Sequence, residues 1–306
     1  MRVIAFDTSN YTTSIAYYDK QQAVNCSQLL PVKEGELGLR QSDAVFQHIK
    51  SLPELSGRLF SDIDVEKISA VGVSTRPRNV EGSYMPCFMV GFSHAKLLAD
   101  TYNVPLITFS HQEGHIAAAA WSAGRLDLLD KPHLAWHLSG GTTELLYVKP
   151  EGCSVRCEKI GGTTDISAGQ LIDRTGQMLH LQFPAGRHLD ELSKSAENND
   201  YFKVKCTGAE FSFSGVQNKV QQYFERTNDA AATAAYTLRT VAETVLKATK
   251  NALEEHTGLP VIFSGGVASN SMLRAVLKPL NPVFAEPKYS TDNAMGVAIL
   301  THRTLG

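Results

Sequence analysis

The segment HLAWHLSGGTT at residues 133–143 decides the fold class, because it repeats the pattern with which the chain begins, RVIAFDTSN at residues 2–10. In both places an apolar stretch enters a turn of small residues, and two further strand-like stretches and then helices follow. A pattern that occurs twice predicts an internal duplication, with two similar α/β lobes. We expect strands at 2–7, 12–19, 22–30, 68–74, 104–109, 133–138, 144–149, 153–160, 260–263 and 283–285.

The same pattern predicts where the lobes divide. We expect an N-terminal lobe over 1–132, a C-terminal lobe over 133–291, and a last helix within 292–306 that packs on the N-terminal lobe. Pro53 and Gly57 are expected to interrupt the first long helix. Ligands in such folds bind at strand ends, where turns and helix N-termini converge. The expected helices lie near 40–60, 85–102, 167–180, 186–197, 214–226, 229–257, 270–278 and 292–303, and a further helix is expected to begin at His111.

Bulk composition describes an ordinary globular chain: 306 residues, 43% hydrophobic and 20% charged. No apolar stretch is long and charge-free enough to span a bilayer, and the apolar opening meets Asp7 too early for a signal peptide. The five cysteines are scattered without CxxC spacing, which favours a reducing cytoplasm and argues against disulfides. A net charge of −2 gives no global attraction to nucleic acid, and no membrane contact is expected.

Two histidines with helical spacing, His111 and His115, are the first candidate for chemistry. Residues i and i+4 lie on one helix face, so two imidazoles can bind one metal ion and leave positions open. The alternative is that two polar side chains share an exposed helix face. A hard third ligand from a distant loop would complete the site, and Asp292 is the candidate. We expect iron or zinc.

Three turns after apolar strands have the composition of phosphate-binding loops. Any one of them alone is more often an ordinary tight turn. Their symmetric placement in two lobes favours a nucleotide site, although the chain has neither a P-loop motif nor a GxGxxG fingerprint. The candidate nucleotide or substrate residues in these turns are Asp7, Ser9, Ser139, Gly140, Gly141, Gly265, Gly266 and Asn270.

ATP or an adenylate is the ligand that these turns suggest. We expect Asn270 near the base, Asp173 near the ribose and Ser139-Gly140-Gly141 near the phosphates. Asp173 lies on an expected helix, where a carboxylate can accept hydrogen bonds from a sugar. The competing interpretation is a solvated helix carboxylate.

Several motifs in order along the chain resemble one family, the tRNA N6-adenosine threonylcarbamoyltransferases, once misnamed O-sialoglycoprotein endopeptidases. The resemblance implies the duplicated actin/hexokinase-like fold, with two lobes around a nucleotide cleft. It covers nearly the whole chain. The motifs are Asp7-Thr8-Ser9, His111-Gln112-Glu113-Gly114-His115, Leu138-Ser139-Gly140-Gly141, Asp165 to Arg174, Phe183-Pro184-Ala185-Gly186, Phe211-Ser212-Phe213-Ser214-Gly215, Gly265 to Asn270 and Ser290-Thr291-Asp292-Asn293.

The resemblance also implies an activity. It is the transfer of a threonylcarbamoyl group from its adenylate to N6 of the adenosine at position 37 in tRNA, with tRNA and partner protein subunits as partners. A metal at His111, His115 and Asp292 would polarise the carbamoyl carbonyl and the departing phosphate. The implied nucleotide-type ligand contacts Ser139, Gly140, Gly141, Asp173, Gly186 and Asn270.

Departures from the family pattern leave a second interpretation open. The family's Cys-Asp-Glu-Thr after the first serine is Asn10-Tyr11-Thr12-Thr13 here, so two acidic residues are absent. Gly-Pro-Gly becomes Arg76-Pro77-Arg78, the histidine after Ser-Gly-Gly becomes Thr142, and a glutamate becomes Gln170. The chain could thus be a diverged paralogue with another acceptor, a non-catalytic partner, or a small-molecule kinase or carbamoyltransferase of the same fold.

A zinc protease is disfavoured, because HExxH requires glutamate directly after the first histidine and residue 112 is glutamine. Transfer to tRNA is expected to be weak without partner subunits, since Lys and Arg that neutralise phosphates dominate tRNA affinity. A modest group of basic residues in the second lobe could form a local patch, or a solvated mixed face. It comprises Arg174, Arg187, Lys203, Lys205 and Lys219.

Overall fold

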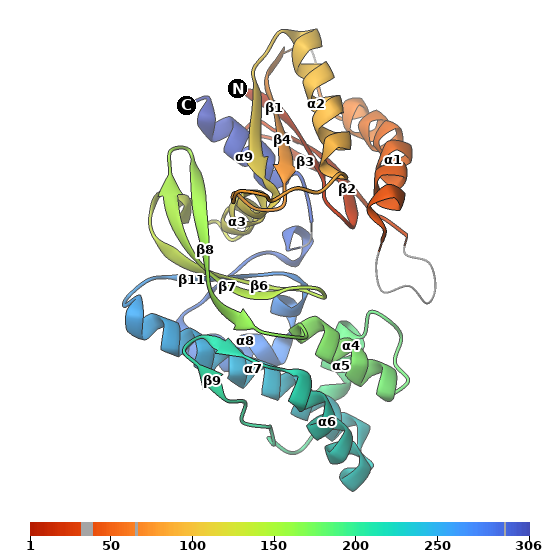
Figure 1. Ribbon diagram of the computed structural model, residues 1–306, viewed down its shortest axis with the longest axis vertical. Helices are drawn as coiled ribbons and strands as arrows, with labels where there is room; N and C mark the ends of the chain where they lie inside the picture. The colour runs from red at the N-terminus through yellow and green to blue at the C-terminus, as the bar shows by residue number, and fades with distance from the viewer. Residues whose placement is uncertain (32–38, 65–66, 291) are drawn as a thin grey trace. The chain divides into compact units, whose positions relative to one another are not determined.

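The computed structural model describes residues 1–31, 39–64, 67–290 and 292–306. These residues form two compact units, which we describe separately. The first unit comprises 1–131, 149–157 and 292–306, and the second comprises 132–148 and 158–291. Figure 1 shows the elements of both units with the labels used below.

The first unit is built on a mixed sheet with the strand order β3-β2-β1-β4-β5. The first three strands form an antiparallel meander, and β4 and β5 add to it in parallel with β1. Parallel strands end at the same edge, so the turn after β1 and the helix after β5 start from one edge of the sheet. The strands are β1 (Arg2–Thr8), β2 (Thr12–Tyr18), β3 (Ala23–Leu29), β4 (Ile68–Arg76) and β5 (Leu106–Ser110).

Helices cover both faces of this sheet. Alternate residues of β1, such as Ile4 and Phe6, share an apolar cluster with leucines of α1 and with residues of α2. Gly72 on β4 faces the other way, toward Val297 and Thr301 of α9. The period of two along each strand therefore separates the α1–α2 face from the α9 face. The helices are α1 (Gln41–Ser61), α2 (Phe88–Tyr102), α3 (His111–Ser122), the 3₁₀ turn η2 (Leu126–Asp130) and α9 (Met295–Thr304).

Two details of these helices differ from the expectation. The expected interruption at Pro53 and Gly57 is wrong, because α1 continues through both residues. Proline removes one backbone donor, but Leu52, Leu55 and Leu59 are buried in the core and hold the helix together. The last helix begins at Met295 rather than at 292, so Asp292 lies in the loop that precedes it.

The second unit repeats the strand order of the first. Its sheet runs β12-β11-β6-β7-β8-β10-β9, so the part β8-β7-β6-β11-β12 corresponds strand for strand to β3-β2-β1-β4-β5. This correspondence confirms the duplication that the sequence predicts. The short pair β9–β10 was not predicted. The strands are β6 (His133–Leu138), β7 (Thr143–Glu151), β8 (Ser154–Thr163), β9 (Cys206–Thr207), β10 (Glu210–Phe211), β11 (Val261–Ser264) and β12 (Val283–Phe284).

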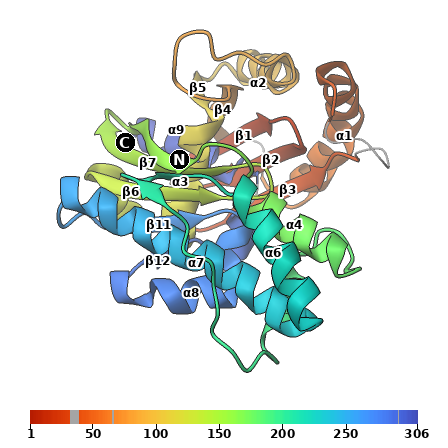
Figure 2. The same ribbon diagram turned by 60° about the horizontal axis from the view of Figure 1, so that its bottom comes forward.

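The long helix α7 is central to the helical layer of this unit, where it packs against α4, α5, α6 and α8 (Figure 2). Its small and β-branched residues face an apolar core around Trp136, Phe211 and Phe263. The helices are α4 (Ala168–Met178), α5 (Gly186–Ser193), α6 (Ser214–Thr227), α7 (Ala230–Glu255) and α8 (Ser271–Leu277), with 3₁₀ turns η3 (Gly266–Ser269), η4 (Lys278–Leu280) and η5 (Pro287–Tyr289).

Within the described residues, none of the helices has the length and apolar character needed to cross a membrane.

Candidate metal centre

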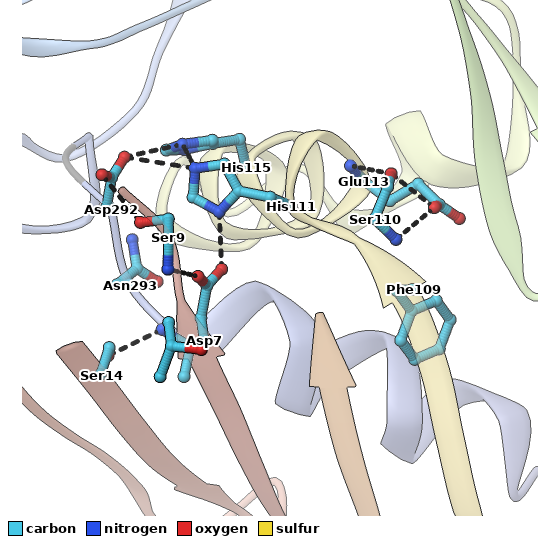
Figure 3. A network of polar contacts seen from close by, with 12 residues as sticks. Asp7, Ser9, Ser14, Phe109, Ser110, His111, Glu113, His115, Asp292 and Asn293 are labelled. Carbon is cyan, nitrogen blue, oxygen red and sulfur yellow. Dashed lines mark hydrogen bonds and ion pairs between the residues drawn. The ribbon is translucent and has the colours of Figure 1, made fainter. Parts of the chain in front are cut away.

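Helix α3 begins with a capping box that fixes the direction of its first turn. The Ser110 hydroxyl accepts from the Glu113 backbone N–H, and the Glu113 carboxylate accepts from the Ser110 N–H at 2.7 Å. The other carboxylate oxygen of Glu113 accepts from the Ser154 hydroxyl at 2.6 Å. Figure 3 shows Glu113 on the side of the helix away from His111 and His115. Both oxygens of the Glu113 carboxylate are thus engaged in contacts on the side of α3 away from the two histidines.

A close helix crossing brings the other end of the chain to these histidines. A Cβ added to Gly296 of α9 would lie 1.8 Å from the carbonyl oxygen of Gly114 on α3, so the two backbones touch there. The start of α9 is also tied to the sheet, because the Ala294 N–H donates to the Ser14 hydroxyl on β2 at 2.9 Å. Both contacts hold the loop that carries Asp292 beside the first turns of α3.

Three ligand atoms converge at this point (Figure 3). Nε2 of His111 lies 2.8 Å from Nε2 of His115, and Oδ1 of Asp292 lies 3.4 Å from the first and 3.0 Å from the second. Ligands of an ion with bonds of about 2.1 Å are about 3.0 Å apart in octahedral and about 3.4 Å apart in tetrahedral geometry. Two imidazoles and one carboxylate are a donor set used for iron and zinc, so the residues present fit such an ion.

Asp7, at the end of β1, orients the first histidine. It is 1% exposed, and its Oδ2 lies 2.6 Å from Nδ1 of His111. A carboxylate bound at Nδ1 keeps the proton there and leaves the Nε2 lone pair for a cation. Burial alone would lower the pKa of His111, but the charges of Asp7 and Asp292 raise it well above its ordinary value. The site therefore favours a positive charge at its centre.

Ser9 links the two carboxylates. Its backbone N–H donates to Oδ1 of Asp7 at 3.0 Å, and its hydroxyl donates to Oδ2 of Asp292 at 3.0 Å. In both Asp7 and Asp292, one carboxylate oxygen accepts a hydrogen bond from Ser9 and the other lies beside a histidine, His111 for Asp7 and His115 for Asp292. Burial would raise the pKa of Asp292, yet His111 and His115 hold it well below its usual range. Asp7 and Ser9, which the sequence predicts as nucleotide or substrate residues, make these contacts with His111 and Asp292.

In the second unit, the turn Ser139-Gly140-Gly141 closes on itself between β6 and β7. The Ser139 N–H donates to the Thr142 carbonyl at 2.8 Å, and the Thr142 N–H donates to the Ser139 hydroxyl. Helix α4 abuts this turn, since a Cβ on Gly169 would lie 2.5 Å from Cα of Gly140. The Ser167 hydroxyl, which caps α4, donates to the Gly140 carbonyl.

The Gly265-Gly266 turn after β11 meets the same strand end. Gly265 has a φ of +91°, and a Cβ there would lie 2.2 Å from the Leu138 carbonyl oxygen. Asn270 caps α8 by accepting from the Leu273 N–H, and its amide donates to Asp190 on α5. Asp190, which the sequence did not single out, also accepts from the backbone N–H and the hydroxyl of Ser271.

Asp173 and Gly186 are joined through the start of α5. Oδ1 of Asp173 accepts from the Ala185 N–H at 2.8 Å, one residue before Gly186 begins the helix. Burial raises the pKa of Asp173, and the bond from Ala185 opposes this effect. In the second unit, the turns that follow β6 and β11 thus contact each other, and the first also contacts the N-terminus of α4. Asn270 links the N-terminus of α8 to α5, and Asp173 links α4 to the start of α5.

Solved structures show which fold this arrangement of strands and helices has. HypF, solved in a phosphate- and nucleotide-bound form, matches with a TM-score of 0.62 and 14% identity over 99% of this chain. The chain spans 46% of that protein, about half its length. Component A of (R)-2-hydroxyglutaryl-CoA dehydratase from Acidaminococcus fermentans matches with a TM-score of 0.58 over 99% of both chains. The fold is the duplicated actin/hexokinase-like α/β fold.

The sequence comparisons are more specific. The family model for tRNA N6-adenosine threonylcarbamoyltransferase matches residues 35–299. A protein of that name from Carboxydothermus hydrogenoformans is 33% identical over 263 residues, covering 82% of this chain and 76% of the relative. Another from Mycoplasmopsis synoviae is 27% identical over 99% of this chain and 98% of the relative. The chain belongs to the tRNA N6-adenosine threonylcarbamoyltransferase family, a family of transferases.

Proposed function

We propose that this protein transfers a threonylcarbamoyl group from its adenylate to N6 of adenosine 37 in tRNA, in a metal-dependent reaction. The N6 amine attacks the carbamoyl carbon, the bond from that carbon to the phosphate oxygen breaks, and AMP and a proton leave. The observation that carries the proposal is the convergence of His111, His115 and Asp292 in a member of this family.

The three converging residues would hold one iron or zinc ion. Such an ion supplies Lewis acidity, which polarises a carbonyl or phosphoryl oxygen. Asp7 fixes the ring of His111 through Nδ1, and Ser9 fixes both carboxylates. These bonds keep the ligand atoms in place before an ion arrives, so less ordering has to accompany binding.

We further propose that ATP or the adenylate binds to the turns and helix N-termini of the second unit. Ser139, Gly140 and Gly141 would contact the phosphates, with Gly265 and Gly266 beside them. Asp173 and Gly186 would contact the ribose, and Asn270 would lie near the base. The support is local: Gly169 and Gly265 allow backbones to approach the end of β6 closely, as a phosphate-binding turn requires.

The expected partners are tRNA and further protein subunits, and the expected compartment is the cytoplasm, where tRNA is modified. The chain has a net charge of −2, so tRNA affinity would have to come from a local basic surface or from a partner.

One observation favours a second candidate, a paralogue that keeps metal and nucleotide binding but uses another acceptor or serves as a non-catalytic partner. The acidic pair that the family carries after Ser9 is replaced by Tyr11 and Thr12. The turn is closed by neutral groups instead, since the Gln41 amide donates to Asn10.

Complementation separates these candidates. A strain depleted of its own transferase would receive this chain, with and without the strain's partner subunits, and threonylcarbamoyladenosine in total tRNA would be measured by mass spectrometry. We expect the modified nucleoside to return with the wild-type chain and not with His115→Ala. No return, together with intact metal and nucleotide binding by the purified protein, would favour the paralogue.

A further inference from the structure

Ser167, a residue that the proposed chemistry does not use, lies where the N-terminus of α4 meets the turn between β6 and β7. Its side chain is buried, and its hydroxyl makes two hydrogen bonds. The hydroxyl accepts from the Gln170 N–H, which caps α4, and donates to the Gly140 carbonyl at 2.5 Å. A carbonyl can only accept, so the direction of the second bond is fixed. One side chain therefore links the start of α4 to the middle of the turn.

The bond to Ser167 sets the direction of the next backbone donor in the turn. In a planar trans peptide the carbonyl oxygen and the N–H point in opposite directions. The Gly140 carbonyl points to Ser167 at the start of α4, so the N–H of Gly141 points away from α4. Glycine populates a wide range of backbone angles, so two adjacent glycines would not fix this direction by themselves. The hydroxyl supplies the restraint that the glycines lack.

The preceding peptide unit of the turn has the same orientation. A Cβ added to Gly169 of α4 would lie 2.5 Å from the Ser139 carbonyl oxygen and 2.5 Å from Cα of Gly140. These two atoms lie on one edge of the peptide unit and the Gly140 N–H lies on the other, so this N–H also points away from α4. The Ala168 N–H donates to the Thr143 hydroxyl at 2.8 Å, which holds the helix against β7.

Neither of these two N–H groups has a hydrogen-bond partner within the described part of the chain. The turn is closed by other groups, since Ser139 and Thr142 bond to each other. Gly140 and Gly141 are exposed, and a Cβ on either would meet no described atom within 4 Å. Two successive backbone donors on an exposed glycine turn are the arrangement that binds phosphate oxygens in many proteins.

We propose that Ser167 is a positioning residue for the nucleotide site. By holding the Gly140 carbonyl against α4, its hydroxyl directs the N–H of Gly141, and with it the N–H of Gly140, toward a bound phosphate. The inference rests on the proposed function, because it assumes that the phosphates of ATP or of the adenylate bind at this turn. It assigns a role in phosphate affinity to a side chain that does not itself contact the phosphates.

The test compares the affinities of the full-length wild-type chain and three variants for ATP and for adenosine, by calorimetry. Ser167→Ala removes both bonds of the hydroxyl. Gln170→Ala is the matched control, because it removes the other half of the same capping box, the bond from the Ser167 N–H, and keeps the bond to Gly140. Ser167→Thr keeps a hydroxyl at the same position. Melting temperatures of the four proteins report folding.

We expect Ser167→Ala to bind ATP about tenfold more weakly than the wild type, because hydrogen bonds to the charged phosphates lose their alignment. Its affinity for adenosine, which has no phosphate, should stay within about twofold of the wild type, since no contact to the nucleoside is lost. Gln170→Ala should keep the ATP affinity to within about twofold, and Ser167→Thr to within about threefold, because both retain the hydroxyl.

Unchanged ATP affinity in a folded Ser167→Ala would overturn the inference. An equal loss of affinity for ATP and for adenosine would also overturn it, because the effect would then not act on the phosphates. The same holds if Gln170→Ala loses as much ATP affinity as Ser167→Ala, since the cap of α4 rather than the turn would be responsible, or if a folded Ser167→Thr binds as weakly as Ser167→Ala. Absence of ATP binding by the wild type would instead refute the nucleotide site itself.

Discussion

The backbones of Gly114 on α3 and Gly296 on α9 are in contact where the two helices cross. A Cβ on Gly296 would lie 1.8 Å from the carbonyl oxygen of Gly114, so only glycine fits at residue 296. This contact joins residues far apart in sequence and brings Asp292 to His111 and His115. The geometry of the candidate metal centre is therefore set by two helices whose backbones are in contact. A methyl group added at residue 296 would therefore be expected to disturb the site, although it would touch none of the three candidate ligands.

Gly296→Ala is predicted to push α9 away from α3 and to displace Asp292. Overpacking of this kind costs about 1–3 kcal/mol of stability, and we expect at least about tenfold weaker Zn²⁺ binding. Chemical denaturation and metal titration measure the two effects. The matched control is Gly57→Ala on an exposed face of α1, where a Cβ meets nothing within 4 Å among the described residues. Unchanged affinity in Gly296→Ala would show that the crossing does not position Asp292.

Asp7→Asn is predicted to weaken metal binding while the protein stays folded. Asparagine keeps an oxygen for the Ser9 N–H but removes the charge that holds the proton on Nδ1 of His111. Loss of a carboxylate behind a metal-binding histidine typically costs about 10–100-fold in affinity. Competition titration is the measurement, with the exposed Asp100→Asn as control. Wild-type affinity in Asp7→Asn would mean that His111 needs no orienting carboxylate.

The metal-free protein is predicted to lose stability in mild acid through His48. Its pKa is about 4 in the folded chain against an ordinary 6.5, so between these values the unfolded chain binds a proton that the folded chain does not. Stability is unaffected by this group above about pH 6.5 and falls as pH drops toward 4, by roughly 3 kcal/mol in total. Denaturation as a function of pH in wild type and His48→Gln isolates the contribution. Parallel pH profiles of the two proteins would contradict it.

Asp173→Asn is predicted to bind ATP about tenfold more weakly than the wild type, because a carboxylate accepts hydrogen bonds from a sugar more strongly than an amide does. The amide oxygen can still accept from the Ala185 N–H, so the melting temperature should stay close to that of the wild type. Calorimetry with ATP and metal gives the affinity, and Glu191→Gln on the exposed face of α5 is the control. Equal ATP affinity in Asp173→Asn would remove this residue from the nucleotide site.

Local sequence patterns predicted most elements of the fold. Apolar strands ending in small residues identified β1, β6 and β11, and their repetition predicted the duplication that the two strand orders show. Pro53 misled the prediction because burial of leucines along α1 outweighs one lost hydrogen bond. The pair β9–β10 was not predicted, because strands of two residues are too short to show an alternation of apolar and polar residues.

The site was only partly accessible from sequence. The spacing of His111 and His115 defines one helix face, and Asp292 was a candidate for the third ligand. The roles of Ser9 and Gly296 depend on contacts between segments more than 180 residues apart in the chain, which no local pattern encodes. The capping box from Ser110 to Glu113 carried a readable Ser-x-x-Glu signal, which would have assigned Glu113 to structure at once.

The most direct test of the central claim is a reconstituted reaction with purified chain, threonylcarbamoyl-adenylate and a tRNA that reads codons beginning with A, in the presence of partner subunits. Mass spectrometry of the digested tRNA would quantify the modified adenosine at position 37. We predict product with wild type and with His94→Ala on α2, and loss of product with His115→Ala or after metal removal by a chelator. Equal product from His115→Ala and wild type, or no product from a wild-type chain that binds both metal and adenylate, would contradict it.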